Sequence, residues 1–596
     1  MADSPEKNSE GVIRLTIFSD GTQLKDSIKI VSVVIEKAVN LIPQARITIL
    51  DGDMPNKEFP VSDTNDFKPG SEIKINAGYK DKEKTIFEGI VVKHSLKITG
   101  DNYSRLLIEC RDKAVSMTIG RKNANYVEVK DSDVFKKLVG NYSSLSVKAD
   151  TTSTKHSELV QYYCTDWDFL LSRAEVNGSL VIVDDGEVNV TAPDVSGSAA
   201  LAVTYGQDLM EFHAEIDARY QYAEVKGTSW DPGTQKVVEQ VAGIESLNAQ
   251  GNLKSSDLSK VIGLDTFKLQ TPTMMESTAL KDWAKSQQVK SGLARITGKM
   301  KFQGTAKAKP GTMIQLSGVG DRFNGKVYVS AVRHEIEDGN WFCEVSFGLS
   351  PDWFAEKRDI ISPPASGLLP GVEGLHIGVV TKLDEDPEKQ HKIKVTVPVL
   401  QAKTEGVWAR LSNYYASSGF GEFFIPEIGD EVILGYLNND PGHPVILGSL
   451  YSSKHKPPYA LTTDNFIKAI VTRSGLKVEF DDENKVITIV TPGKNEIVIS
   501  DKEKSILVQD QTNNKVELKS SGITLDSPKD ITINAKGKIS LDAVGEISIS
   551  SKADIKASGL NIEHDAKVGM TAKGGASAEL SAGGNTTVKG AMVMIN

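Results

Sequence analysis

The chain has 596 residues and a formal net charge of −10 at pH 7, with 39% hydrophobic and 25% charged residues. This composition is typical of a soluble protein with several domains, and the acidic balance argues against a nucleic-acid-binding protein. The three cysteines are too few for a disulfide framework, so we expect them to be reduced core residues of a protein made in the cytosol.

The N-terminal part of the chain reads mainly as strands. Residues 1–10 are polar, without the apolar segment of a secretion signal, and we expect a flexible N-terminus there. Residues 11–361 are predicted to form one β domain with minor helical parts. Helices are predicted after Asp131-Ser-Asp133, which resembles an N-cap, after Asp166, and over Ser277–Gln288, which closes a polar, loop-rich stretch over 230–285.

Two distant segments of this domain resemble each other. Lys68-Pro-Gly-Ser-Glu-Ile-Lys-Ile75 matches Lys309-Pro-Gly-Thr-Met-Ile-Gln-Leu316, and a Phe-x-Gly segment, a histidine (His94, His334) and a cysteine (Cys110, Cys343) follow each. Two barrels could converge on such turn chemistry, but five features in the same order favour duplication. We therefore predict two similar β-barrels, over about 11–120 and 294–350, with an α+β region between them.

A Pro/Gly/Ser-rich linker is predicted over 362–373, before a compact β segment over 374–455. Five short strands with Gly and Pro corners in this segment suit a small OB-like barrel.

The C-terminal part keeps an eight-residue period, in which Ile531, Ile539, Ile547 and Ile555 each open a short alternating run. Alternation indicates strands with one buried face, and a fixed short period indicates a solenoid. The residues expected to point into its core are Ile531, Ile533, Ile539, Leu541, Ile547, Ile549 and Ile555.

Eight residues make one strand and one corner, which is too little for one chain to close a three-sided coil. We therefore predict a trimeric, intertwined β-helix needle over 466–596. A single-chain β-helix with three octads per coil stays open as the alternative. Three chains that each carry two similar barrels would also form a ring of six quasi-equivalent units, able to stack on a six-fold tube.

The segment after the linker carries the most specific motifs, within Trp408-Ala-Arg410, Ile425-Pro-Glu-Ile-Gly-Asp-Glu-Val432 and Asp440-Pro-Gly-His-Pro-Val-Ile-Leu-Gly-Ser-Leu-Tyr451. They resemble the signature of VgrG proteins, the spikes of bacterial type VI secretion systems, which are related to the hub and spike of contractile phage tails. The first 120 residues also resemble hub proteins of released contractile particles. The residues taken as the barrel signature are Trp408, Arg410, Pro426, Gly429, Asp430, Pro441, Pro444 and Gly448.

The resemblance implies a homotrimeric spike that caps a tube of hexameric rings, contacts baseplate components, and pierces a target envelope with only transient membrane contact. It implies a PAAR-type tip protein, for which the apolar residues Met592, Val593, Met594 and Ile595, with Asn596, are the expected platform. Because the chain stops there, any effector is expected to be a separate cargo. We expect the protein to be cytoplasmic until the machine exports it.

The sequence gives little support for catalysis. The pairs Asp51-Gly-Asp53 and Asp384-Glu-Asp386 lie in turn-like segments, and the histidines and cysteines show no metal-ligand spacing. A β-helical enzyme or adhesin that acts on polysaccharide is the less favoured alternative, because no aromatic residue follows Phe480. We expect no catalytic residue, no metal and no cofactor.

Overall fold

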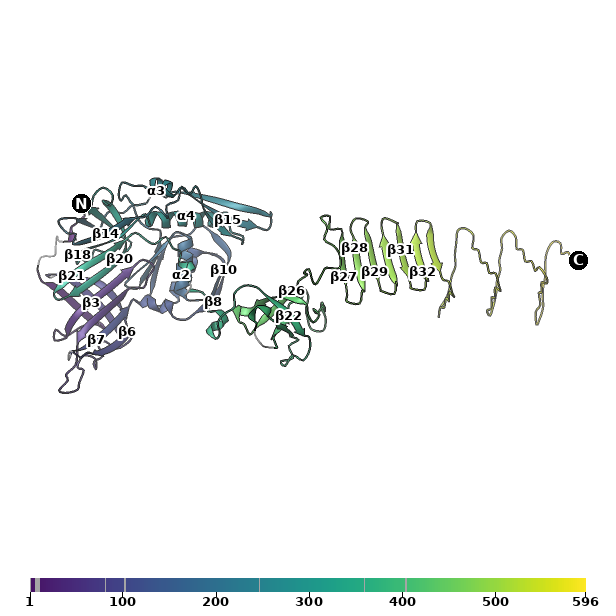
Figure 1. Cartoon of the computed structure of the whole chain (residues 1–596), viewed down its shortest axis with the longest axis horizontal. Helices are drawn as coiled ribbons and strands as arrows, with labels where there is room; N and C mark the ends of the chain where they lie inside the picture. The colour runs from purple at the N-terminus through teal and green to yellow at the C-terminus, as the bar shows by residue number, and fades with distance from the viewer. Residues whose placement is uncertain are drawn as a thin grey trace. The chain divides into compact units, whose positions relative to one another are not determined.

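The computed structural model of the protein describes residues 2–5, 11–80, 82–100, 103–245, 247–357, 360–401 and 405–595. The chain divides into two units, Met1–Leu450 and Tyr451–Asn596. Strands predominate in both, which confirms the predicted mainly β class (Figure 1). Among the described residues, no helix has the length and apolar character that crossing a membrane requires.

The first unit is built on a sheet of 13 strands. Its main path runs β14-β18-β21-β20-β3-β4-β7-β6-β5-β1-β2, and β19 pairs with β20 and β13 beside that path. The strands of the first half are β1 (Ile13–Ser19), β2 (Thr22–Gln23), β3 (Lys29–Ala38), β4 (Gln44–Leu50), β5 (Glu72–Tyr79), β6 (Lys84–Ile98) and β7 (Ser104–Arg111). Those of the second half are β13 (Leu201–Thr204), β14 (Glu211–Ile216), β18 (Ile296–Gln303), β19 (Met313–Ser317), β20 (Gly325–Glu337) and β21 (Asn340–Phe347).

The two halves share one strand order, which supports the predicted duplication. The first half is ordered β1-β5-β6-β7-β4-β3 and the second β13-β19-β20-β21-β18-β14. The Pro-Gly turns are equivalent: Gly70 N donates to Val91 O at 2.9 Å, and Gly311 N donates to Val329 O at 2.8 Å. A register shift follows directly after each of these two valines. Val91 and Val329 therefore mark the same position in the two halves.

The recurring histidines and cysteines, by contrast, are not equivalent. Cys110 lies opposite Val91, whereas the residue opposite Val329 is Phe347. Cys343 instead lies opposite His334. That part of the sequence match was wrong, because like residues within one strand do not fix its register.

The halves are also not two separate barrels within the boundaries predicted for them. Strand β3 of the first half pairs with β20 of the second, so one sheet runs through both (Figure 1). The second half takes β13 and β14 from residues 201–216, outside the predicted 294–350. The start of the chain adds to it, because Asp3 bridges Leu201 and forms an ion pair with Lys307. Asp3 is thus held in place, contrary to the flexible N-terminus expected there; Met1 and residues 6–10 lie outside the described ranges.

Helices and small sheets occupy the region between the halves. The predicted helices are α1 (Asp131–Gly140), α2 (Asp166–Val176) and α4 (Ser277–Leu293). The stretch predicted as loops instead contains a sheet of three strands and the helix α3 (Ser255–Ile262). The prediction was wrong because polar residues dominate these strands and hide their alternation. Its strands are β15 (Glu224–Asp231), β16 (Lys236–Gly243) and β17 (Phe267–Thr271). The remaining strands are β8 (Lys122–Lys130), β9 (Ser146–Ala149), β10 (Lys155–Cys164), β11 (Leu180–Asp184) and β12 (Glu187–Thr191).

The predicted OB-like barrel is a closed barrel of five strands in the order β22-β23-β24-β26-β25. Val395, Val432 and Leu434 are among the residues of its core. Its strands are β22 (His376–Lys382), β23 (Ile393–Thr396), β24 (Val407–Leu411), β25 (Glu431–Tyr436) and β26 (Pro444–Ser449).

The second unit begins with seven antiparallel strands that pair in chain order (Figure 1). They are β27 (Ile467–Val471), β28 (Lys477–Asp481), β29 (Val486–Val490), β30 (Glu496–Ser500), β31 (Ser505–Gln509), β32 (Lys515–Lys519) and β33 (Gly522–Asp526). Consecutive strands of one chain are neighbours here, so the intertwined winding predicted from 466 onward is wrong over 467–526. Turn residues such as Thr491 and Asn495 close local hairpins in this segment, where the eight-residue period does not hold.

Residues 527–595 differ from the sheet before them in that they contain no strand. The chain runs as an extended wave without strand pairing (Figure 1). A single-chain β-helix would show parallel pairing between successive coils, and the described residues over 527–595 show none. This favours the intertwined needle, and both alternatives stay predictions for this range.

Candidate functional surfaces

The joint between β3 and β20 holds together the two halves of the 13-stranded sheet, which with the helices and small sheets between them is called the hub. The ladder runs from Ala331 opposite Ala38 to Glu337 opposite Ser32. Arg333 Nη1 lies 2.6 Å from Glu36 Oε1 across it. Backbone pairing, buried aliphatic side chains and one cross-strand ion pair thus make this joint.

Three residues of the barrel signature, Gly429, Asp430 and Pro441, lie in the turns before and after β25. Gly429 has a φ of +93°, which favours glycine, and Asp430 Oδ2 accepts a hydrogen bond from Glu427 N at 2.9 Å. Pro441 follows Asp440, whose Oδ1 accepts from Gly442 N at 2.8 Å. The remaining signature residues are the buried Pro426, Trp408 and the exposed Arg410 on β24, and Pro444 and Gly448 on β26.

One face of the seven-stranded sheet in the second unit is almost wholly aliphatic. Two rows of directly opposed residues cross it from strand to strand, and several, such as Ile489 at 44%, stay exposed in the single chain. The first row is Ile470, Val478, Ile489, Ile497, Val508, Val516 and Leu525. The second row is Lys468, Phe480, Ile487, Ile499, Ile506, Leu518 and Ile523.

The other face of this sheet carries mostly polar residues, among them Glu479, Thr488 and Glu517. An open groove of about 890 Å³ lies along the aliphatic face and reaches Ile531. The sheet therefore presents one apolar face that its own chain leaves uncovered, which for a soluble protein marks an interaction surface.

The predicted needle-core residues continue this uncovered surface. In the single chain their side chains are between 52% and 74% exposed, so their inward orientation stays a prediction. They are Ile531, Ile533, Ile539, Leu541, Ile547, Ile549 and Ile555. The predicted tip residues Met592, Val593, Met594 and Ile595 are exposed as well, and Asn596 lies outside the described residues.

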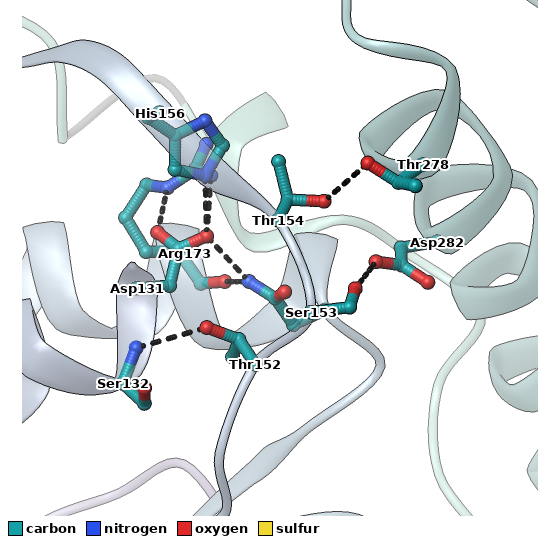
Figure 2. Close-up of polar contacts among 10 residues, drawn as sticks. Asp131, Ser132, Thr152, Ser153, Thr154, His156, Arg173, Thr278 and Asp282 are labelled. Atoms are coloured by element: carbon teal, nitrogen blue, oxygen red, sulfur yellow. Dashed lines mark hydrogen bonds and ion pairs between the residues drawn. The ribbon is translucent and has the colours of Figure 1, made fainter. Parts of the chain in front are cut away.

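A buried ionic cluster centred on Asp131 lies at the start of α1 (Figure 2). Asp131 is 1% exposed and accepts hydrogen bonds from Arg173 Nε at 2.7 Å, Arg173 Nη2 at 2.9 Å and Asn177 Nδ2 at 2.9 Å. His156 Nε2 is 2.9 Å from the same carboxylate. Burial alone would raise the pKa of Asp131, but the hydrogen bonds from His156, Arg173 and Asn177 outweigh it and hold the pKa well below its usual range.

The adjoining loop before β10 ties this cluster to α4 (Figure 2). Ser132 N donates to Thr152 Oγ1 at 3.2 Å, and Ser153 Oγ donates to Asp282 Oδ2 at 2.7 Å. Thr154 Oγ1 also donates to a threonine of α4. Asp131 was expected to cap a helix, but Lys130 is the N-cap and the Asp131 carboxylate is fully used in tertiary contacts. The arrangement stabilises the packing of α1 and α2.

A His–Cys pair also lies in the hub. His334 Nδ1 is 3.1 Å from Cys343 Sγ, and both side chains are buried. Burial lowers the pKa of His334 to about 3 and raises the pKa of Cys343 to about 12. Both groups are neutral at pH 7, so the pair lacks the thiolate that a nucleophile needs. Within the described ranges, no group of three or more His, Cys, Asp or Glu side chains is placed to hold a metal ion.

Two family models match the chain. Residues 9–338, more than half of it, match the Alg8 N-terminal domain, and residues 376–451 match the type VI secretion system/phage-baseplate injector OB domain. The chain belongs to the Alg8 N-terminal domain family, and its five-stranded barrel is similar to the injector OB domain of type VI secretion systems and phage baseplates. The family resemblance of the barrel signature is thereby confirmed.

Curated members of the spike family match over short segments. The actin cross-linking toxin VgrG1 of Vibrio cholerae is 46% identical over 54 residues, which are 9% of this chain and 5% of that protein. The type VI secretion system spike protein VgrG1a of Pseudomonas aeruginosa is 33% identical over 78 residues, 13% of this chain and 12% of that protein. The matched segments thus span far less than two thirds of either relative.

Solved structures show distant likeness to this chain. The 43 kDa tail protein of prophage MuSo2 from Shewanella oneidensis has a TM-score of 0.43 and 10% identity, over 57% of this chain and 98% of that one. A chain of the Francisella PdpA-VgrG complex has a TM-score of 0.37 and 11% identity, over 84% of this chain and 80% of that one.

Two features could not be found in the sequence as it was interpreted, the Asp131 cluster and the aliphatic face over 467–526. The cluster joins Asp131 to residues 25 to 46 positions further along the chain and left no local signal. The aliphatic face did leave one, since Ile487-Thr-Ile489 and Ile497-Val-Ile499 alternate like the octads. Its spacing differs from eight, which hid it behind the more regular repeat.

Proposed function

We propose that three copies of this protein form the spike of a contractile injection machine, which pierces a target envelope. The observation that carries the proposal is the aliphatic face of β27–β33. A sheet with one apolar and one polar face must cover the apolar side, and three such sheets cover one another as a three-sided prism. Two such sheets would form a sandwich, so the number three rests on the octads that follow them.

The octads from Ile531 onward support the same number of chains. Their backbone groups have no strand partner within the described single chain. Unpaired strand edges are costly and prone to aggregate, and winding three chains together gives each strand a neighbour. Each level then adds main-chain hydrogen bonds and buries aliphatic side chains along the axis, so the shaft resists unfolding under load.

The duplicated hub supports a role at the end of a tube. Three chains with two similar halves each would present six quasi-equivalent units, which suits a tube of hexameric rings. The hub would contact the tube protein and baseplate components, and effectors would be carried as separate cargo. Before assembly the protein would be cytoplasmic, and the machine would export it.

The exposed apolar residues Met592, Val593, Met594 and Ile595 fit a platform for a small PAAR-type tip protein. Methionine side chains adapt to an apolar partner, which suits such a contact. The tip partner would then bind at the end of the needle opposite to β27.

The resemblance of the first 120 residues to hub proteins of released contractile particles makes a released particle the second form of this proposal. Sedimentation of particles from cell-free culture medium separates the two. Recovery of the protein with sheathed particles in the medium supports the released form, and retention with cells supports an anchored machine.

Native mass measured by light scattering on the full chain tests the proposal. We expect three times the chain mass of 64.6 kDa. A species of 64.6 kDa at micromolar concentration would contradict the trimeric spike. A glycan array with the same sample tests the alternative that the protein is an enzyme or adhesin acting on polysaccharide. We expect no glycan to bind, and binding would support that alternative.

A further inference from the structure

One edge of β6 lacks the neighbour that its counterpart in the second half possesses. In the second half, β19 and β3 lie in succession along one edge of β20, and β21 lies along the other. In the first half, β5 covers the start of the matching edge of β6. Over Lys93–Ile98, no strand of the described chain pairs with that edge.

The strand equivalent to β3 is β14, and its outer edge is likewise unpaired in the described chain. Strand β14 pairs with β18 alone, whereas β3 pairs with both β4 and β20. The two unpaired edges, on β6 and on β14, correspond to the two edges that meet in the β3–β20 joint.

Exposure of apolar side chains points to the same missing contact. Counting from the equivalent residues Val91 and Val329, Ile98 occupies the position of Ile336. Ile336 is 7% exposed beneath the β3–β20 joint, whereas Ile98 is 68% exposed. An exposed isoleucine in a ladder position where its counterpart is buried indicates a covering strand from outside the chain.

The ladders also give the register. The pairing from strand to strand, starting at Val91 and Val329, relates the two halves residue by residue. In this alignment Glu36 is equivalent to Glu215, and Arg333 is equivalent to Ser95. Since Arg333 lies opposite Glu36, Ser95 would lie opposite Glu215.

The charges of the two edges are complementary in this register. Lys93 and Lys97 flank Ser95 on the same face of β6, so in this register both lysines lie diagonal to Glu215, and Lys97 lies directly opposite His213. Opposite charges at such diagonal positions stabilise an antiparallel pair.

We propose that β14 of one protomer adds to β6 of the next in antiparallel register, with Ser95 opposite Glu215, and that this contact repeats around the hub. The inference rests on the proposed trimer and names its interface. Each protomer offers one edge and receives the other, a head-to-tail contact that closes into a ring. The hub would then be a continuous ring. Around this ring, the β3–β20 contact within each chain would alternate with a similar β14–β6 contact between chains.

A disulfide between chains tests the register. The variant Ser95→Cys/Glu215→Cys is made in a Cys164→Ser background, which removes the partly exposed native thiol. Directly opposed residues of an antiparallel pair have Cα atoms about 4.5–5.5 Å apart, within reach of a disulfide. After mild oxidation we expect a covalent trimer on a non-reducing denaturing gel.

The matched control is Ser95→Cys/Glu211→Cys, whose second cysteine lies on the same face of β14 about 13 Å along the strand. We expect no covalent trimer from it. A variant that is trimeric by light scattering, yet forms no disulfide or forms as much as its control, would overturn the edge pairing while leaving the spike proposal intact. A monomeric native protein would overturn both.

A charge reversal gives a second readout. We expect Glu215→Lys to cause loss of the trimer at a concentration where the native chain is fully trimeric, because it would place three lysines together. The control Glu239→Lys reverses a charge that faces Lys226 within the β15–β16 hairpin and should keep the trimer. Equal dissociation of the two variants would count against the proposed interface.

Discussion

The guanidinium group of Arg173 donates two hydrogen bonds, of 2.7 and 2.9 Å, to the carboxylate of Asp131 at the start of α1. Because Asp131 is almost fully buried, removal of Arg173 leaves a carboxylate without its principal counter-charge in a region of low dielectric constant.

We expect Arg173→Met to lower the free energy of unfolding of the hub by about 3–5 kcal/mol, the usual cost of breaking one side of a buried ion pair. Urea denaturation followed by tryptophan fluorescence measures the change. The control is Arg219→Met, since Arg219 forms an ion pair with Asp217 at the surface, and we expect it to change the free energy of unfolding far less. Similar losses in both variants would mean that the Asp131 cluster contributes no more than a surface pair.

The same carboxylate predicts a dependence of stability on pH. Its pKa is lower in the folded chain than in the unfolded chain, so the unfolded state binds more protons as the pH falls below about 4. The stabilisation is fully present above the unfolded pKa and is lost as the pH falls toward the folded pKa. We expect Asp131→Asn to destabilise the hub more at pH 6 than at pH 3, measured by urea denaturation at both values. A constant difference would contradict the pKa assignment.

The cysteines should differ in reactivity. Cys110 and Cys343 are buried and have pKa values raised to about 12, whereas Cys164 is partly exposed. We expect iodoacetamide at pH 8 to modify Cys164 first in the native protein, because the thiolate is the reactive form and must meet the reagent. Peptide mass spectrometry after timed quenching locates the label. Early labelling of Cys343 would show that the hub opens around His334.

Needle assembly should depend on the isoleucines of the octads. We expect Ile547→Asp/Ile549→Asp to lower the thermal stability of the trimer strongly, because two charges per chain would enter a closed apolar axis. Lys552→Asp changes charge at an expected outward position and should have little effect. Differential scanning calorimetry compares the two, and equal shifts would argue that these isoleucines face solvent in the assembled needle.

The tip should be separable from the shaft. Deletion of 591–596 is expected to abolish capture of a PAAR-type partner and to leave the native mass unchanged. A pull-down with the tagged partner, together with light scattering, measures both properties. Undiminished capture would locate the partner elsewhere on the spike.

Much of the β architecture could be predicted from local patterns. The five-stranded barrel follows from short alternating runs between Gly and Pro corners, and the Pro-Gly turns at Gly70 and Gly311 do occupy equivalent places. Pairing between distant strands could not be predicted, because a strand such as β3 carries no local mark of its β20 partner. For the same reason the two halves were expected to be separate barrels.

The contacts of single polar residues were harder to predict. Asp131 has the sequence context of a helix cap, and only the fold brings Arg173 and His156 to it. The histidine and cysteine that follow each Pro-Gly turn were part of the match that predicted duplication, yet they occupy different ladder positions, since His334 lies opposite Cys343 and His94 lies opposite Ile108. Residue identity in a strand is informative only once its register is known.

The antiparallel pairing over 467–526 also bears on the order of events during assembly. Hairpins joined by short turns form quickly within one chain, whereas the octads after Ile531 must wait for two other chains. Three preformed sheets that meet through their aliphatic faces would be held at one common height. The wound shaft would then start from a fixed level in all three chains, so that the chains begin to intertwine without slipping by a repeat.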